Sequence, residues 1–169
     1  MITLDIAANI AEVIGALTII GGMLFGYIQL REYRKQNLGM VAGELIRTFY
    51  SPDFALSTNL VRRLPDGASA EEIRSMNPKY EEAATILCFT FETMGLLMYR
   101  RIAPYHLVME MTGGIIVVMW RKLHVLVETI REEQSQPNFA EWFQWLAEQS
   151  GISEINSEPS YLKYKNWKP

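Results

Sequence analysis

The chain has little of what most catalytic and metal sites are built from. Its 169 residues include one cysteine and two histidines. A single cysteine excludes an internal disulfide, and together with two distant histidines it excludes the usual zinc-ligand spacings. The sequence also has no phosphate-binding glycine loop and no nucleophile-elbow serine motif. We therefore expect no cofactor, no metal and no enzymatic activity.

The sequence also has no large excess of either sign of charge. The 16 basic and 19 acidic residues nearly cancel, leaving a net charge of −3. Such a balance creates no global field that would attract nucleic acid. Strand signals are missing as well, because no segment after Leu30 alternates apolar and polar residues over five or more positions. The sequence therefore predicts an all-α protein.

What the sequence does have is one long uncharged run, from Val13 to Leu30. As a helix these eighteen residues would rise roughly 27 Å, close to the roughly 30 Å of a bilayer's hydrocarbon core. A cleaved signal peptide would need a basic start and a small-residue cleavage site, and this run has neither. A buried core helix is usually shorter and amphipathic, whereas this run is apolar all round. We therefore predict a transmembrane helix.

The flanks of the run predict its orientation. Arg31, Arg34 and Lys35 follow it, whereas the charged residues that precede it, Asp5 and Glu12, are acidic. The positive-inside rule places the N-terminus outside and the chain from Arg31 onward in the cytoplasm. We expect Glu12 to lie at headgroup depth. Deeper in the bilayer it would be an intramembrane carboxylate with a functional role.

One face of the predicted span carries small residues, which allow two helix backbones to approach closely in lipid. They recur at spacings of four, three, four and four: Ala11, Gly15, Thr18, Gly22 and Gly26. This face predicts a homo-oligomer formed through the transmembrane helix. The polar residues available to line a pore within such an oligomer are Asn9, Glu12 and Thr18. So thin a polar lining implies a narrow or hydrophobically gated pore.

The helical pattern continues beyond the predicted span. No proline occurs before Pro52, so residues 31–50 are expected to form an amphipathic connecting helix. We divide the chain into an N-terminal segment with the span (1–30), this connecting helix (31–50), a cytoplasmic bundle of four or five helices (51–150) and a tail (151–169).

Caps and breakers mark the helices of the bundle. Ser51 and Pro52 are typical of a helix start, and Ser69 with Glu72 forms a capping-box pattern. The helices expected after the connecting one cover residues 54–63, 70–76, 79–99, 105–133 with an interruption at Gly113-Gly114, and a last one from Pro137 to a C-cap at Gly151.

The helix at 79–99 is apolar over most of its circumference, so it should be largely buried. Its apolar residues are Ile86, Leu87, Phe89, Phe91, Met94, Leu96, Leu97 and Met98, and Cys88 lies among them as a small hydrophobe. Glu92 interrupts them as a buried polar residue. It either ties helices together or serves as a catalytic or ligand-binding group. The partners expected for its carboxylate are Arg100, Arg121, Lys122 and the indole of Trp120.

The tail interleaves aromatic and basic residues. Its aromatic residues are Tyr161, Tyr164 and Trp167, and its cations include Lys163 and Lys165. This composition suits base stacking beside phosphate contacts, and it equally suits the lipid headgroup region or a solvated tail. Together with Arg100 and Arg101, these residues form a possible site for an oligonucleotide or nucleotide ligand. A protein partner at the helical domain is the other possibility.

Several short motifs resemble a bacterial family of small, single-span, membrane-anchored all-α proteins that carries a domain-of-unknown-function label. The resembling segments are 12–16, 29–31, 91–97 (FETMGLL), 120–123 (WRKL), 130–132 (IRE), 138–139 (NF) and 145–146 (WL). One departure from the family is the pair Arg100-Arg101, where a glycine-containing turn is expected. The resemblance carries no catalytic residues over to this chain.

These observations together lead to a hypothesis about function. We expect a non-enzymatic, self-associating protein of the bacterial inner membrane whose cytoplasmic domain senses a ligand or partner. Small anchored proteins of this layout include membrane-perturbing effectors of antiphage defence, and that analogy extends the hypothesis to a pore. The alternative is a membrane-anchored scaffold or interaction protein. A remote alternative is a membrane-bound enzyme that uses Glu92.

Overall fold

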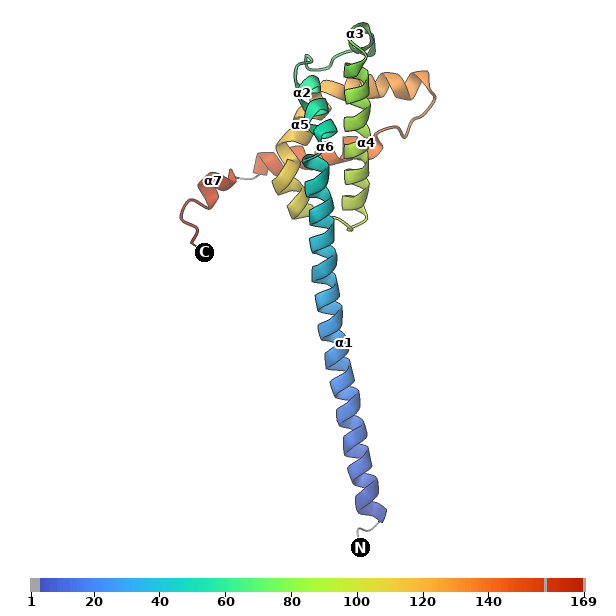
Figure 1. The fold of residues 1–169 in the computed structure, drawn as a ribbon, viewed down its shortest axis with the longest axis vertical. Coiled ribbons are helices and arrows are strands. Elements are labelled where there is room, and N and C mark those ends of the chain that lie inside the picture. Colours follow the sequence, from blue (N-terminus) through green and yellow to red (C-terminus); the bar gives the residue numbers. More distant parts are fainter. Residues whose placement is uncertain (1–3, 157, 169) are drawn as a thin grey trace. The chain divides into compact units, whose positions relative to one another are not determined.

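The computed structural model describes residues 4–156 and 158–168, and these residues form helices and turns without a strand (Figure 1). The helices are α1 (Leu4–Phe49), α2 (Pro52–Arg62), α3 (Ala70–Ser75), α4 (Lys79–Tyr99), α5 (Tyr105–Glu133), α6 (Glu141–Asn156) and α7 (Ser160–Lys163). The predicted all-α class is confirmed. The chain consists of two compact units, Met1–Met40 (unit 1) and Val41–Pro169 (unit 2).

The described residues of unit 1, 4–40, belong to one unbroken helix, α1. Within α1, the stretch Ala8–Tyr33 is long and apolar enough to cross a membrane, and none of it is buried. The stretch contains the predicted run Val13–Leu30 and extends it at both ends. The side chains of Asp5, Arg34 and Lys35 lie outside the described residues, so the orientation derived from the flanks stays a prediction.

The end of α1 and the start of α2 are set by the local sequence. Without a proline or another break, α1 continues to Phe49, as expected for a connecting helix. Ser51 adopts an extended conformation, and its hydroxyl accepts a hydrogen bond from the backbone N–H of Phe54 at 3.2 Å. Pro52 follows at the first helical position, where a missing N–H costs nothing.

The connection between α2 and α3 is fastened to α5. Gly67 has a φ of +68°, a left-handed conformation that glycine adopts without steric cost, and its N–H donates to the carbonyl of Arg121 at 2.9 Å. The ammonium of Lys122 donates to the carbonyl of Leu64 at 2.5 Å and to Asp66 at 3.0 Å. The capping box predicted at α3 is present, with both of its reciprocal bonds.

The core of unit 2 lies among α2, α4, α5 and α6. Aromatic rings run through it from the end of α1, where Phe49 packs edge-on against Phe54 at 5.1 Å between centroids. Phe54 then meets Phe91 at 5.9 Å, and Phe91 stacks on Phe143 at 4.9 Å. Trp120 contacts the edge of Phe143 at 5.1 Å. These rings join every long helix of unit 2 in one packed series.

The prediction that α4 is largely buried is right on one side and wrong on the other. Leu87, Phe91 and Met94 are buried, because α2 and α6 cover their side of the helix. Phe89 is 60 % exposed and Leu96 is 37 % exposed, so these two predictions were wrong. Apolar residues around a whole helix do not indicate how many neighbouring helices cover it.

The predicted boundaries of α5 and α6 also need correction. α5 is continuous through Gly113-Gly114, because a helical glycine lowers stability without breaking the helix. α6 begins at Glu141, since Pro137 and Asn138 lie in the turn that precedes it. Gly151 is not a C-cap. The helix runs through it to Asn156, because backbone hydrogen bonding there is uninterrupted.

Candidate functional site

The small-residue face of α1 is open along the part of the chain that the structure describes. Ala11, Gly15, Thr18 and Gly22 are exposed, and Gly26 is partly exposed. A Cβ atom built on Gly15, Gly22 or Gly26 would meet no atom within 4 Å. No other part of the described chain covers this face, and its role in self-association stays a prediction.

The polar residues of the predicted span differ in what their side chains can offer. Asn9, Glu12 and Thr18 are all exposed. The hydroxyl of Thr18, however, donates to the carbonyl of Ile14 one turn earlier, at 2.8 Å. Because its hydrogen is used inside the helix, Thr18 can present only an acceptor to a neighbouring helix or to an ion. The donors of the predicted polar lining are thus reduced to the amide of Asn9.

Glu92 of α4 caps the N-terminus of α6. Its Oε2 accepts a hydrogen bond from the backbone N–H of Phe143 at 2.9 Å, and the N–H of Trp142 also bonds to the carboxylate. The first N–H groups of a helix have no partner within that helix. Ala140, the residue before α6, has no side-chain oxygen to satisfy them. Glu92 supplies that acceptor from a neighbouring helix.

Gly95 allows α6 to approach α4 closely enough for this cap. A Cβ atom built on Gly95 would lie 2.3 Å from the backbone oxygen of Trp142 and 2.8 Å from its carbonyl carbon. Glu92 and Gly95 are three residues apart, so both lie on the same side of α4. The first turn of α6 therefore packs on this side of α4, where Gly95 allows the backbones to come close and Glu92 accepts hydrogen bonds from the free amides.

Arg131 of α5 holds the chain segment that enters α6. Its Nε donates to the carbonyl of Phe139 at 2.8 Å, and its Nη1 donates to the side-chain oxygen of Gln144 at 2.9 Å. Ala140 between them is buried and has a φ of +54°, which only a well-determined turn imposes on a residue with a Cβ atom. Arg131 therefore contributes to fixing both the turn and the first turn of α6.

These contacts determine the protonation of Glu92. Burial raises the pKa of its carboxyl above the ordinary range, because the charged form loses solvation. The backbone N–H groups of Phe143 and Trp142 oppose this by stabilising the carboxylate, and the charge of Arg131 acts in the same direction. The side chain is partly exposed, less buried than predicted. Its geometry is that of a helix cap.

None of the partners that the sequence suggested for Glu92 bonds to it: Arg100 is exposed in the turn after α4, and the other three have other roles. Lys122 binds Leu64 and Asp66, and Trp120 packs against Phe143. Arg121 lies 3.7 Å from Asp66. Sequence reasoning missed that backbone amides of α6 are the true partners. The signal was present in the segment 91–97, where an acidic residue and a glycine are spaced to share one helix face.

The cysteine and the two histidines, the other residues that could carry chemistry, have no contact with one another in the structure's described contacts. Cys88 is buried as predicted, and burial raises the pKa of its thiol to about 12. The Nδ1 atom of His124 lies 3.1 Å from the carbonyl oxygen of Arg121, and His106 is exposed beside Tyr105. Within the described part of the chain, no group of three or more His, Cys, Asp or Glu side chains could hold a metal ion.

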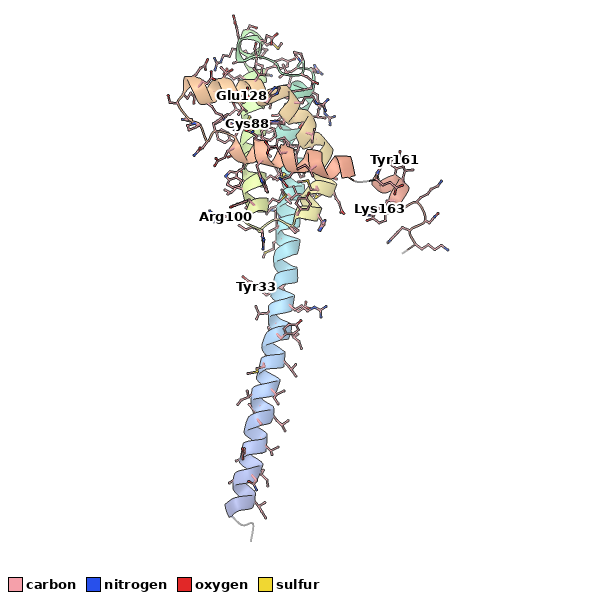
Figure 2. The ribbon with its side chains drawn as sticks, turned by 180° about the vertical axis from the view of Figure 1, so that it is seen from behind. Tyr33, Cys88, Arg100, Glu128, Tyr161 and Lys163 are labelled. Atoms are coloured by element: carbon pink, nitrogen blue, oxygen red, sulfur yellow. The ribbon has the colours of Figure 1, made fainter. Side chains whose placement is uncertain are left out.

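The basic and aromatic residues proposed to bind an anion are exposed. Arg100 and Arg101 lie in the turn between α4 and α5. The exposed residues of the tail are Tyr161, Lys163, Tyr164, Lys165 and Trp167, and the ammonium of Lys163 lies 5.1 Å from the ring centroid of Tyr164. Figure 2 labels Arg100 just after the end of α4, on the side of the view opposite Tyr161 and Lys163 of α7. The structure thus presents two basic surfaces and does not join them into one site.

An apolar groove of about 320 Å³ lies between α2 and α4. Its lining includes the apolar residues Leu56, Leu60 and Ile86 and the charged residues Asp53, Lys79 and Glu82. Its charges are mixed in sign, and its lining has no residue that the motifs single out.

Comparison with known proteins identifies a family over most of the chain. The family described as Domain of unknown function (DUF4760) matches residues 6–150. No curated protein and no solved structure matches the chain. The matched range runs from α1 into α6 and includes every motif on which the resemblance was based.

Proposed function

The chain belongs to the DUF4760 family, and from that premise we propose that it is a single-pass membrane protein that self-associates through α1 and carries a sensing or docking domain in unit 2. The observation that carries the proposal is the stretch Ala8–Tyr33, which is apolar, long enough to span a bilayer and unburied. In water such a surface would be strongly unfavourable, because hydrophobic stabilisation follows the apolar area removed from water. A bilayer removes that cost.

Self-association is supported by the open face of small residues. Gly22 and Gly26 form a GxxxG pair with no atom within 4 Å of the Cβ positions. In lipid, helices associate by close packing more than by the hydrophobic effect, so small residues at the contact favour assembly. The proposal places one copy of α1 against another along this face.

Communication between span and domain is supported by the continuity of α1. The helix runs without a break from Leu4 in unit 1 to Phe49 in unit 2, where the ring of Phe49 packs on Phe54. A separation or rotation of assembled spans would therefore act on Phe49, and a change in unit 2 would act on α1. The domain is proposed to bind the ligand or partner that drives this change in the cytoplasm of a bacterial cell.

A matched set of glycine variants tests the assembly. Gly22→Ile with Gly26→Ile places bulky side chains on the small-residue face and should lower the oligomer mass in mild detergent, measured by light scattering. Gly21→Ile adds the same side chain to the same helix on a different side, and Gly21 also has open space around its Cβ position. It should leave the oligomer intact. Equal oligomers in both variants would move assembly to unit 2.

Insertion itself is tested by fractionating the full chain. Protein that stays with the membrane after alkaline carbonate washing fits the proposal, and protein released by that wash contradicts it. A cytoplasm-dependent reporter fused after Pro169 should be active if unit 2 lies inside the cell. A reporter active only at the N-terminus would reverse the proposed orientation.

An anchored scaffold and a pore-forming effector of antiphage defence remain the two forms of this proposal. The hydrogen bond from Thr18 to Ile14 favours the scaffold, because it removes a donor from an already thin polar lining. Membrane potential, measured with a dye in cells that express the full chain with its neighbouring genes, separates the two. Depolarisation that Gly22→Ile with Gly26→Ile abolishes and Gly21→Ile preserves would establish the pore.

A further inference from the structure

The turn between α4 and α5 combines two arginines with exposed apolar side chains. Tyr99 is 55 % exposed, Ile102 52 % and Tyr105 41 %. Arg100 and Arg101 between them are exposed, and no ion pair holds either one within the described residues. We call these five residues the arginine turn. Solvent-facing aromatic and aliphatic groups beside unpaired cations are the side chains that favour a membrane–water interface.

Arg101 occupies a backbone position that favours glycine. Its φ is +57°, and the turn has the Schellman pattern of hydrogen bonds, from the N–H of Ile102 to the carbonyl of Leu97 and from that of Arg101 to the carbonyl of Met98. Glycine is the usual residue at this place, because a Cβ atom disfavours the left-handed conformation. The sequence departs from a glycine turn at the position where one is sterically preferred. The guanidinium has no described contact that would compensate for the strain.

The arginine turn lies at the end of unit 2 at which the unit's own part of α1, residues 41–49, begins. Phe49 of α1 and Phe91 of α4 both contact the ring of Phe54. Val41 precedes Phe49 by eight residues in α1, and Tyr99 follows Phe91 by eight residues in α4. Within unit 2, α1 and α4 run in opposite directions, so the start of the unit 2 part of α1 and the end of α4 lie at the same end (Figures 1 and 2). Eight helical residues, roughly 12 Å, also separate Val41 from Tyr33, the last residue of the apolar stretch. A bilayer that holds this stretch is thus connected to the start of unit 2 by only these eight residues of chain.

We propose that the arginine turn docks on the anionic lipid surface of the membrane that α1 crosses, an inference that rests on the proposed function. The guanidinium groups of Arg100 and Arg101 would bind lipid phosphates, while Tyr99, Ile102 and Tyr105 enter the headgroup region. Because the chain tethers unit 2 to the bilayer, the turn meets the lipid surface at a high effective concentration. Docking would fix how unit 2 is held against the membrane and make that arrangement sensitive to lipid composition.

The test is a fluorescent probe at Ile102 in the full chain. Ile102→Cys is labelled with an environment-sensitive dye, and Cys88 stays unlabelled because it is only 2 % exposed and its thiol pKa is raised. The protein is reconstituted into vesicles of phosphatidylcholine alone or mixed with phosphatidylglycerol. The dye should shift to the blue only in the anionic vesicles. Met76→Cys, at the end of α3 and 39 % exposed, is the matched control and should not respond.

Arginine variants measure the contribution of each cation. Removing one arginine near an anionic surface should lower the ratio of docked to free turn about fivefold, and removing both about thirtyfold. Arg101→Gly removes a charge and also relieves the left-handed strain, so it should lose docking while unit 2 unfolds at a higher temperature. Arg100→Gln tests the second cation. A loss of docking with a gain in stability cannot be explained by misfolding.

Two outcomes overturn the inference without touching the proposed function. One is protein that floats with the vesicles but shows the same dye emission in both lipid mixtures. The other is a blue shift in phosphatidylcholine vesicles on addition of inorganic phosphate or a short oligonucleotide, which would assign the turn to a soluble anion. Protein that fails to float with any vesicle overturns the proposed function and the inference with it.

Discussion

Two helices of this protein are similar in composition and opposite in surroundings. The stretch Ala8–Tyr33 of α1 and the helix α4 are both apolar around most of their circumference. In α4, Leu87 and Phe91 are completely covered by neighbouring helices, whereas Leu17 in α1 is 62 % exposed. An apolar composition alone therefore does not separate a buried core helix from a candidate membrane span. What separates them is whether neighbouring helices cover the apolar side chains.

The strongest test of this comparison places a charge on an exposed apolar residue of each unit. Ile20→Asp should keep the full chain out of the membrane, because an acid at the centre of a span costs about 3 kcal/mol. Leu56→Asp changes a residue of α2 that is 62 % exposed and should cost less than about 1 kcal/mol, with normal membrane association. Membrane fractionation measures the first effect and denaturation the second. Equal membrane association of the two variants would contradict the view that the exposed apolar surface of α1, and not that of α2, lies in the bilayer.

The next test adds one methyl group to two helical glycines of unit 2. Gly95→Ala forces a Cβ atom against the backbone of Trp142 and should lower the free energy of unfolding by about 2–3 kcal/mol. Gly151→Ala meets no atom within 4 Å and should raise it by about 0.5–1 kcal/mol, since alanine is the better helix former. Tryptophan fluorescence during denaturation in detergent reports both. A neutral Gly95→Ala would mean that α6 packs less closely than described.

Glu92 gives a smaller effect, which depends on pH. Glu92→Ala removes the acceptor for the first amides of α6 and should cost about 1–2 kcal/mol of unfolding free energy, whereas Glu92→Gln keeps an acceptor oxygen and should cost less. Because the folded pKa of Glu92 is raised, the folded state binds the proton more tightly than the unfolded state. Stability should therefore fall as pH rises from the unfolded pKa to the folded pKa, and stay level above it.

The Glu92→Gln variant is the control for that pH dependence, because it cannot titrate. The difference in unfolding midpoint between wild type and Glu92→Gln should shift in favour of the variant as pH rises through this window. A constant difference would show that Glu92 is not perturbed. A stable, folded Glu92→Gln protein that has lost all function in cells would instead indicate a chemical role for the carboxylate.

The smallest effect is expected at an exposed ion pair of unit 2. Arg74 bonds to both carboxylate oxygens of Glu133, at 3.0 and 2.7 Å, and links α3 to the end of α5. Both side chains are well exposed, so solvent and salt screen the attraction. Arg74→Gln should shift the unfolding temperature only slightly, and the shift should disappear at high salt. A large shift that persists in salt would mean that the pair is shielded from solvent.

Much of the fold was predictable because it depends on near neighbours in sequence. Ser51 and the Ser69–Glu72 capping box determine helix starts through contacts three residues apart, and Pro52 favours the first helical position. All three signals were predicted correctly. The start of α6 was not, because its cap comes from another helix. A prediction based on local patterns places that start at Pro137, whereas the first amides that need an acceptor are those next to Glu92.

The sequence by itself determined that the chain is helical, that one stretch is long and apolar enough to span a bilayer, and that α1 continues unbroken to Phe49. These properties follow from composition and helical periodicity. Only the tertiary structure decided the role of Glu92, because its partner, the N–H of Phe143, lies 51 residues away and is an ordinary backbone group. No residue type identifies such a partner. Its position depends on how α4, α5 and α6 pack together.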